Sequence, residues 1–272
     1  MTQTCFSPPV TSIIMAAGRG SRMKGYSGNK TLLPLVPGNT PFEGRQPILL
    51  NLLDFLPHGP KALIVNHCKA DVIRTTAHTG VVCLEQPVLN GTGGAILAAS
   101  AFLSQTPSDT VIITMGDVPF VRKATYKTLA AGLSSHELMI LGFSPTDKKQ
   151  YGVLEIKGQK VKKITEWKYW RDYPPHLQDS LTICNSGIYA ARRQTLCRYL
   201  PILASRPQII QKEINGRLTD IEEFFFTDLI EYMVRDGLAV GYHVTENEHE
   251  TMGIDDLEAL QKAQAFYAKK MA

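Results

Sequence analysis

A glycine-rich, basic loop follows the first apolar run of this sequence. Residues 13–17 read Ile-Ile-Met-Ala-Ala, and residues 18–30 then contain four glycines together with Arg19, Arg22, Lys24 and Lys30. Glycines let a backbone come close to a ligand and point its N–H groups at phosphate oxygens, while Arg and Lys neutralise the phosphate charge. The stretch therefore predicts a polyphosphate site at the end of a buried strand.

Two common phosphate-binding loops do not fit this residue order. A Walker loop needs a Lys followed by Ser or Thr directly after its last glycine, and that pair is missing at the required offset. A dinucleotide-binding loop needs a third glycine three residues after Gly20, where Met23 stands. Gly18 and Gly20 alone are a weak signal, and a plain strand-to-helix turn is the open alternative.

Further segments that could bind a base, a sugar or a metal follow in order along the chain. They are Gln86, Leu89–Gly93, Met115–Pro119, Tyr151-Gly152, Ile164–Lys168, Asn185–Tyr189, Glu223–Asp228 and Gly253–Asp255. Together with Ala16–Met23 and Lys30, they resemble the signature segments of the sugar-1-phosphate nucleotidyltransferases. The resemblance covers nearly the whole chain and is closest to the uridylyltransferase half of bacterial N-acetylglucosamine-1-phosphate uridylyltransferases.

The resemblance implies a reaction without a protein nucleophile. An oxygen of a sugar 1-phosphate would attack the α-phosphorus of a nucleoside triphosphate, and pyrophosphate would leave. Catalysis then consists of positioning the substrates and neutralising their charge. The implied catalytic residues are Arg22 and Lys30, and the implied cofactor is Mg²⁺, which needs only one or two carboxylates, here Asp117 and Asp255.

The resemblance also assigns the two substrates to separate sets of residues. The nucleotide would be bound by Ala16, Ala17, Gly18, Gly20, Ser21, Gln86, Gly91 and Thr92. The sugar would be bound by Gly152, Glu166, Asn185 and Thr227. A Gln side chain can pair with the N3–H of uracil and with an adjacent carbonyl, using its acceptor and its donor together.

Departures from the family pattern leave the substrates open. Ser21 replaces the usual Thr, the gap from Arg22 to Lys30 is one residue longer, and Asn29 replaces a Pro. Further differences are Met115 for an aromatic residue, Asn90 and Gly94 in the second glycine loop, and Asp255 where this branch often has Asn. We expect UTP and N-acetylglucosamine 1-phosphate, with CTP or dTTP, and glucose, muramic acid or polyol phosphates, as alternatives.

Less specific interpretations of the same residues remain. Asp117 is also typical of a turn before Pro119, and Asp255 could only cap the last helix. The chain could be a sensor that binds a nucleotide sugar without catalysis, although a pure binder does not need Arg22, Lys30 and both carboxylates. A nicotinamide oxidoreductase is disfavoured by the missing third glycine.

Apolar runs alternate with helical segments in the first half of the chain. Strands are predicted at 12–16, 62–66, 81–85, 110–114 and 138–143, and helices at 47–56, 70–77, 91–103 and 123–133. Residues 30–36 are predicted to be extended. This alternation predicts an α/β fold with a mostly parallel sheet between two helical layers, a Rossmann-like three-layer arrangement with ligands at the carboxyl ends of the strands.

The pattern changes after residue 145. We predict a hairpin of 152–156 and 161–166, a strand pair within 181–190, a helix at 222–235, a strand at 239–244 and a last helix at 255–270, capped by Asp255 and Asp256. The expected organisation is a single domain over 1–272. Its parts would be a nucleotide-binding half at about 1–145, a sugar-binding lid at about 146–252, and a closing metal-ligand segment and helix at 253–272. The sequence carries no hexapeptide repeats, so we expect no acetyltransferase β-helix.

Composition narrows the classes of partner and compartment. Hydrophobic residues make up 44% of the 272 residues and charged residues 20%, and the net charge of +4 is scattered, so we expect no nucleic-acid partner. No apolar run reaches membrane-spanning length and no signal peptide is recognisable. The five cysteines lack a metal-ligand spacing, which predicts reduced thiols in a cytoplasmic protein, with Cys83 and Cys184 buried. Nothing in the sequence indicates an oligomeric state.

Overall fold

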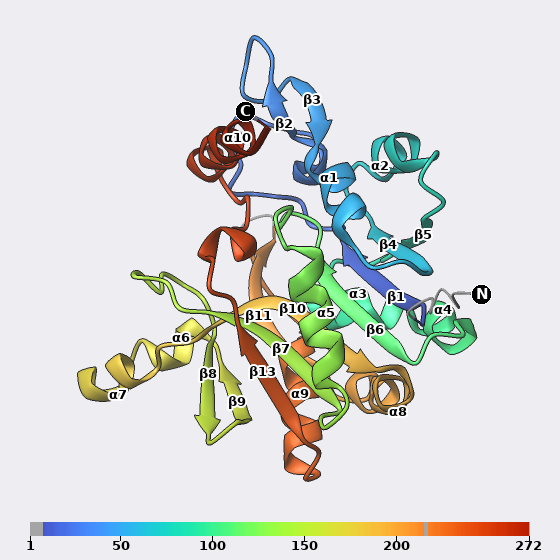
Figure 1. Cartoon of the computed structure of the whole chain (residues 1–272). Coiled ribbons are helices and arrows are strands. Elements are labelled where there is room, and N and C mark those ends of the chain that lie inside the picture. Colours follow the sequence, from blue (N-terminus) through green and yellow to red (C-terminus); the bar gives the residue numbers. More distant parts are fainter. Residues whose placement is uncertain (1–7, 215–216, 272) are drawn as a thin grey trace, which may run out of the picture.

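A central sheet of nine strands runs through the molecule in the computed structural model, which describes residues 8–214 and 217–271 (Figure 1). Cys5 and the rest of the first seven residues lie outside this range. Seven of these nine strands are neighbours in the order β13, β7, β10, β6, β1, β4, β5. Their bounds are β1 Val10–Met15, β4 Lys61–Val65, β5 Val82–Glu85, β6 Thr110–Met115, β7 Leu138–Phe143, β10 Cys184–Arg192 and β13 Val240–Val244.

Six of these seven strands run in the same direction. The neighbours β1–β4, β1–β6, β4–β5 and β7–β13 pair in parallel, whereas β10 is antiparallel to both β6 and β7. The hairpin of β8 (Val153–Lys157) and β9 (Lys160–Thr165) joins the sheet because β8 pairs with the start of β10. The carboxyl ends of the six parallel strands therefore meet at one edge, where the first residues of β10 also lie.

Two helical layers cover the sheet because successive strand residues point to opposite faces. Ile13, Ile64 and Ile113 join one core with α3 (Gly91–Ala98), α4 (Ser100–Gln105), α8 (Arg193–Ala204) and α9 (Phe226–Arg235). Ile14 and Leu63 join the other core with α1 (Ile48–Phe55), α2 (Lys69–Thr76) and α5 (Lys123–Gly132). The predicted three-layer α/β arrangement with a mostly parallel sheet is confirmed.

The last helix packs beside an early part of the chain. α10 (Leu257–Met271) lies next to the small sheet of β2 (Pro34–Pro37) and β3 (Gly44–Pro47) (Figure 1). The buried side chain of Gln264 donates to the carbonyl oxygens of Pro34 at 2.9 Å and Pro41 at 2.8 Å. The remaining short elements are η1 (Lys30–Leu32), α6 (Trp167–Trp170), α7 (Pro175–Ser180) and η2 (Glu248–Thr251).

The prediction of one continuous helix at 91–103 was wrong. The structure divides it into α3 and α4 at Ala99, whose φ of −89° and ψ of 0° break the regular helix. The hydroxyl of Ser100 donates to the carbonyl oxygen of Leu97 at 2.7 Å. A serine that bonds to its own backbone in this way competes with the helical hydrogen bonds and bends the chain.

The predictions for 181–190 and 222–235 also need correction. Residues 184–192 form one strand, β10, with an irregularity in its pairing between Asn185 and Tyr189, and do not form a pair of strands. The helix predicted from residue 222 begins at Phe226, since residues up to Glu223 belong to β12 (Arg217–Glu223), which pairs with β11 (Gln208–Ile214). The N-cap residue Phe225 has an extended backbone, and the N–H of Phe224 donates to the carbonyl oxygen of Asn90 at 2.8 Å.

Three smaller expectations changed as well. The segment 30–36 begins with the turn η1 and is extended only from Pro34. Asp256, and not Asp255, caps α10, because its Oδ1 accepts the N–H of Ala259 at 2.9 Å. Cys184 is buried as predicted, but Cys83 is only half-buried.

Every helix within residues 8–214 and 217–271 is too short or too polar to cross a lipid bilayer.

Candidate active site

Several of the predicted site residues lie at one edge of the sheet because they follow the ends of parallel strands. The glycine loop follows β1, Gln86 follows β5, and Asp117 lies two residues beyond the end of β6. Asn185 is the second residue of the antiparallel β10, so it lies at the same edge. The crevice at the carboxyl ends of such a sheet is where α/β proteins bind ligands.

Asn29 fixes the end of the glycine loop. Its side chain is 1% exposed, and its amide nitrogen donates to the carbonyl oxygens of Ala16 and His67, each at 2.9 Å. Its Oδ1 accepts the N–H of Thr31 at 3.0 Å and so caps the turn η1, in which Lys30 lies. The Asn that departs from the family pattern thus ties the loop to the end of β1 and holds Lys30 in place.

Lys30 lies between the two carboxylates predicted to bind metal. Its Nζ is 2.7 Å from Oδ1 of Asp255 and also forms an ion pair with Oδ2 of Asp117. Nη2 of Arg22 lies 2.9 Å from Oδ1 of Asp255. Lys30 is 16% exposed, whereas Arg22 is 69% exposed. Burial alone would lower the pKa of Lys30, but the two carboxylates outweigh it and raise this pKa above its ordinary value.

Two cavities meet at this charged group. The smaller, of about 180 Å³, is lined by the predicted nucleotide residues Ala16, Gly18, Gly20 and Ser21. The larger, of about 750 Å³, is lined by the predicted sugar residues Gly152, Glu166, Asn185 and Thr227. Both cavities are lined by Arg22, Lys30, Met115, Asp117 and Asp255. The charged residues therefore form a wall shared by the two cavities.

Glu166 is the central acidic group of the larger cavity. Its Oε1 accepts a long hydrogen bond of 3.4 Å from the hydroxyl of Thr227. Gly152 lies against it, because a Cβ at that position would be 3.2 Å from Oε2. Burial raises the pKa of the Glu166 carboxyl, and the Thr227 bond opposes this shift only in part. Glu166 is thus held in a site that disfavours its charge, as is common for functional carboxylates.

Asn185 is fixed at the start of β10. Its backbone N–H donates to the carbonyl oxygen of Gly152 at 2.8 Å, and its side chain donates to the hydroxyl of Tyr189 at 2.9 Å. Its Oδ1 accepts the N–H of Gly187 at 3.1 Å. These contacts leave Asn185 little rotational freedom at the cavity wall.

The second glycine loop lies apart from the smaller cavity. Gln86 is buried, and its Nε2 donates to Oδ1 of Asn90 and to the carbonyl oxygen of Gly91, each at 3.1 Å. Gln86, Gly91 and Ala17 line neither cavity, whereas Thr92 lines the larger one and accepts the N–H of Phe226 at 3.1 Å. Of the predicted nucleotide residues, the structure therefore brings the first loop, but not the second, to the charged wall.

A family model described as the MobA-like NTP transferase domain matches residues 12–169, more than half of the chain. The chain belongs to this family. The family assignment agrees with the resemblance found in the sequence, since both point to transfer of a nucleotidyl group from a nucleoside triphosphate.

A related protein extends the comparison beyond residue 169. The Bifunctional protein GlmU of Sphingopyxis alaskensis is 33% identical over 239 residues, covering 84% of this chain and 46% of that protein. A similar GlmU protein of Cereibacter sphaeroides is 27% identical over 267 residues, covering 96% of this chain and 53% of that protein. The chain thus spans about half the length of the curated relatives it matches.

Solved structures share the fold at low identity. The uridine diphosphate N-acetylglucosamine pyrophosphorylase of Trypanosoma brucei superposes with a TM-score of 0.72 at 11% identity, covering 94% of this chain and 65% of that one. A CMP:2-keto-3-deoxy-manno-octonic acid synthetase complexed with CTP gives a TM-score of 0.64 at 15% identity, covering 96% and 99%.

The carboxylates of Asp117 and Asp255 suit a hard divalent cation. No group of three or more His, Cys, Asp or Glu side chains arranged to hold a metal occurs among the described residues. Mg²⁺ does not need one, because it keeps several waters and is bound in nucleotide sites by one or two carboxylates plus phosphates. Asp117 and Asp255 both contact the same ammonium group, so their oxygens converge on a point where a cation is stabilised. The residues present therefore fit Mg²⁺.

Gln208 escaped the sequence interpretation, which included Asp228 only as the last residue of the segment Glu223–Asp228. Nε2 of Gln208, at the start of β11, donates to both carboxylate oxygens of Asp228 in α9, at 2.8 and 2.7 Å, and both residues line the larger cavity. Burial raises the pKa of Asp228, and the Gln208 bond opposes this. The dipeptide Asn215-Gly216 between two β-prone runs was a usable signal for the hairpin that carries Gln208.

Proposed function

We propose that this chain transfers a nucleotidyl group from a nucleoside triphosphate, UTP in preference, to a sugar 1-phosphate, N-acetylglucosamine 1-phosphate in preference. The products would be a nucleotide sugar and pyrophosphate. The observation that carries this proposal is the wall of Arg22, Lys30, Asp117 and Asp255 shared by two cavities. Two substrates bound in adjoining cavities would bring their reacting phosphates together at that wall.

The basic residues of the wall have the chemistry that this reaction requires. A triphosphate and a sugar phosphate repel one another, so their approach needs neutralising charge at the point of contact. Lys30 is held by the turn that Asn29 caps, and it would contact the phosphates from a fixed position. Arg22 is exposed on the loop and would close onto the leaving pyrophosphate. Such preplaced donors stabilise charge that develops in the transition state.

The carboxylates supply the metal-binding part of the proposed site. Asp117 and Asp255 would hold Mg²⁺, which when bound polarises phosphate oxygens and offsets the charge of the leaving group. Lys30, now paired with both carboxylates, would then be released toward the phosphates. The loop residues Gly18, Gly20 and Ser21 would present backbone N–H groups to the triphosphate.

The preference for UTP rests on the family resemblance, because Gln86, the predicted base-binding residue, lines neither cavity in this structure. Nε2 of Gln86 is already engaged by Asn90 and by the carbonyl oxygen of Gly91. This leaves the side-chain oxygen of Gln86 to accept a hydrogen bond, which either the N3–H of uracil and thymine or the N4 amino group of cytosine could donate. The T. brucei enzyme with the same fold is a uridine diphosphate N-acetylglucosamine pyrophosphorylase, which supports UDP-N-acetylglucosamine as the product here. CTP is the runner-up, because the synthetase with the same fold was solved with CTP.

Pyrophosphate release over a grid of triphosphates and sugar phosphates tests the proposal. We expect turnover in Mg²⁺, fastest with UTP and N-acetylglucosamine 1-phosphate. Asp117→Ala should reduce turnover by more than about 100-fold, because the metal would lose a ligand at the reacting phosphates. Asp179→Ala, in the exposed part of α7, is the matched control and should retain wild-type turnover.

Absence of turnover would decide against this function, and an unaffected Asp117→Ala variant would decide against its metal site. If the wild-type chain releases no pyrophosphate from any pair, the reaction type is wrong. If turnover is present but Asp117→Ala changes it little, the carboxylate does not hold a catalytic metal. Nucleotide-sugar binding without turnover would favour the non-catalytic sensor.

A further inference from the structure

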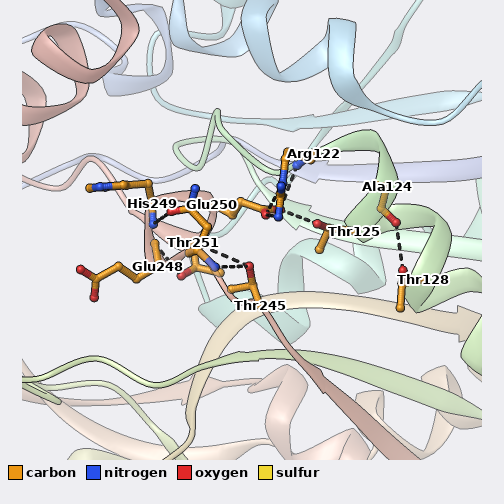
Figure 2. Close-up of polar contacts among 10 residues, drawn as sticks. Arg122, Ala124, Thr125, Thr128, Thr245, Glu248, His249, Glu250 and Thr251 are labelled. Carbon is orange, nitrogen blue, oxygen red and sulfur yellow. Dashed lines mark hydrogen bonds and ion pairs between the residues drawn. The ribbon is translucent and has the colours of Figure 1, made fainter. Parts of the chain in front are cut away.

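A buried carboxylate outside both cavities joins two loops of the site. Glu250 is 2% exposed and lies in η2, five residues before Asp255. Its carboxylate accepts hydrogen bonds from Arg122 and Thr125, at the beginning of α5 (Figure 2). Arg122 itself lies five residues after Asp117. The contact thus connects the loop that carries one predicted metal ligand to the loop that carries the other.

Glu250 supplies the cap that α5 lacks. Arg122 is the N-cap residue of this helix, and its side chain makes no capping hydrogen bond there. Oε2 of Glu250 accepts the backbone N–H of Arg122 at 3.1 Å and the hydroxyl of Thr125, the third residue of the helix. Oε1 accepts from the Arg122 guanidinium. A carboxylate commonly closes the first turn from the third helical position, and here a distant residue takes that role.

The charge of Glu250 is stabilised at this position. Burial would raise the pKa of its carboxyl, but the bonds from Thr125 and from Arg122 outweigh burial and lower this pKa. The beginning of a helix also favours a negative charge. Glu250 is therefore held as a carboxylate, and its link to α5 is a charged one.

The connecting segments are short and fixed at both ends. The backbone N–H of Ile254 donates to the carbonyl oxygen of Asp117 at 3.1 Å, and Ile254 is fully buried in a core with Phe120. Asn247 caps η2 by accepting the N–H of His249 at 3.0 Å, and the hydroxyl of Thr251 donates to the carbonyl oxygen of Glu248 at 3.1 Å. These contacts fix the loop from β13 to Asp255 against the loop that follows β6.

We propose that Glu250 is a positioning residue that sets the spacing between Asp117 and Asp255 for a divalent cation. The inference rests on the proposed function, because it takes these carboxylates as the metal ligands. Mg²⁺ and Mn²⁺ tolerate little error in the distances to their oxygen ligands, so a small shift of one loop weakens binding. Residues that orient metal ligands typically contribute about 10–100-fold in metal affinity or activity.

This role can be tested by titrating the full chain with Mn²⁺, with and without UTP. The EPR signal of the free ion measures how much Mn²⁺ is bound. Glu250→Gln keeps the shape but removes the charge, and Thr125→Val removes only one hydroxyl donor. Each should weaken Mn²⁺ binding by at least about tenfold. Thr125→Ser keeps the hydroxyl and should restore binding. Glu248→Gln makes the same change of charge on the exposed side of η2 and should bind Mn²⁺ as the wild type does.

The possible results separate this inference from the proposed function. If Glu250→Gln and Thr125→Val lower only the unfolding temperature and bind Mn²⁺ normally, Glu250 is merely structural and the inference fails. A wild-type chain that binds no Mn²⁺ would also overturn it. If the wild type binds Mn²⁺ through Asp117, as loss of binding in Asp117→Asn would show, but releases no pyrophosphate, only the proposed function fails. Selective loss of Mn²⁺ binding in the two variants supports the inference in either case.

Discussion

Nζ of Lys30 lies 2.7 Å from Oδ1 of Asp255, although 225 residues separate them in the sequence. The same Nζ pairs with Asp117, so one ammonium group lies between two carboxylates that would otherwise repel each other. A divalent cation at that point would do the same with twice the charge. In the proposed function, Lys30 and Mg²⁺ would be alternative partners for these carboxylates, and metal binding would be coupled to the release of Lys30 toward the phosphates.

Replacing Lys30 by Met should separate these two roles. Turnover should fall by about 100–1,000-fold, the usual effect of losing a donor that stabilises transition-state charge. Mn²⁺ binding in the absence of nucleotide should become tighter, because no ammonium group then competes for Asp117 and Asp255. Steady-state kinetics and Mn²⁺ titration measure the two effects. Lys24→Met, an exposed change in the same loop, should alter neither, and weaker Mn²⁺ binding in Lys30→Met would contradict the competition.

Two neighbouring aspartates should show opposite effects when each is changed to Ala. Asp255 forms ion pairs with Arg22 and Lys30, whereas Asp256 caps α10. Asp255→Ala should abolish most turnover with little loss of stability. Asp256→Ala should lower stability by about 1 kcal/mol, as for a lost helix cap, and leave turnover intact. Kinetics and thermal unfolding of both variants measure this, and equal effects on turnover would rule out a specific role for Asp255.

The effects of substitutions at Gly94 and Asn90 should depend on each other. A Cβ at Gly94 would lie 1.8 Å from Oδ1 of Asn90 and 2.9 Å from Nε2 of Gln86. Gly94→Ala should therefore displace both side chains, costing about 1–3 kcal/mol of stability and raising KM for the triphosphate. Adding Asn90→Ala should relieve much of the clash, so the two changes should be strongly non-additive. Simple additivity in unfolding and KM measurements would show that the two positions are not coupled.

Glu166→Gln should stabilise the fold while weakening sugar binding. Burial raises the pKa of Glu166 above its ordinary value of 4.5, so the folded chain binds this proton more tightly than the unfolded chain does. The charge consequently costs stability at neutral pH, and the cost disappears as the pH falls below the unfolded value near 4.5. KM for the sugar phosphate should rise by about tenfold, since a hydrogen bond to a charged group is lost.

Unfolding temperatures across pH measure the first effect. Glu166→Gln should exceed the wild type in unfolding temperature at pH 7, with the difference shrinking toward pH 4. A wild type that is more stable at pH 7 would mean that Glu166 contributes to the fold. Glu155→Gln, in the neighbouring hairpin, provides a comparison of the same charge change outside the cavity lining.

The central strands could be predicted from the sequence because their side chains are buried on both faces. Runs such as Thr110–Thr114 are nearly all β-branched and permit no other assignment in an alternating pattern. The glycine loop and Asp117 could be placed as well, since carboxyl ends of parallel strands share an edge. By contrast, β12 is largely exposed and polar, so its sequence carries little hydrophobic periodicity.

Contacts between residues far apart in the chain could not be predicted. Glu250 accepts hydrogen bonds from Arg122 and Thr125, which lie more than 120 residues earlier in the sequence. No local sequence pattern distinguishes Glu250 from Glu248, which is exposed. Asn29 shows the same limit. Its polar side chain marked a departure from the family pattern, but only its four buried contacts explain how a loop without the usual Pro keeps Lys30 in place.

The position of β10 has a consequence for how the chain folds during translation. β6 and β7 follow one another in the sequence, yet β10 lies between them in the sheet. The 77 residues from Met115 to Arg192 take roughly 4–15 s to synthesise at about 5–20 residues per second. During that interval the edge of β6 that β10 will cover stays open to mispairing, as does that of β7 once residues 138–143 have been synthesised. The segment matched by the family model ends at residue 169. Expressed alone, it would therefore lack β10, the strand that lies between β6 and β7 in the sheet.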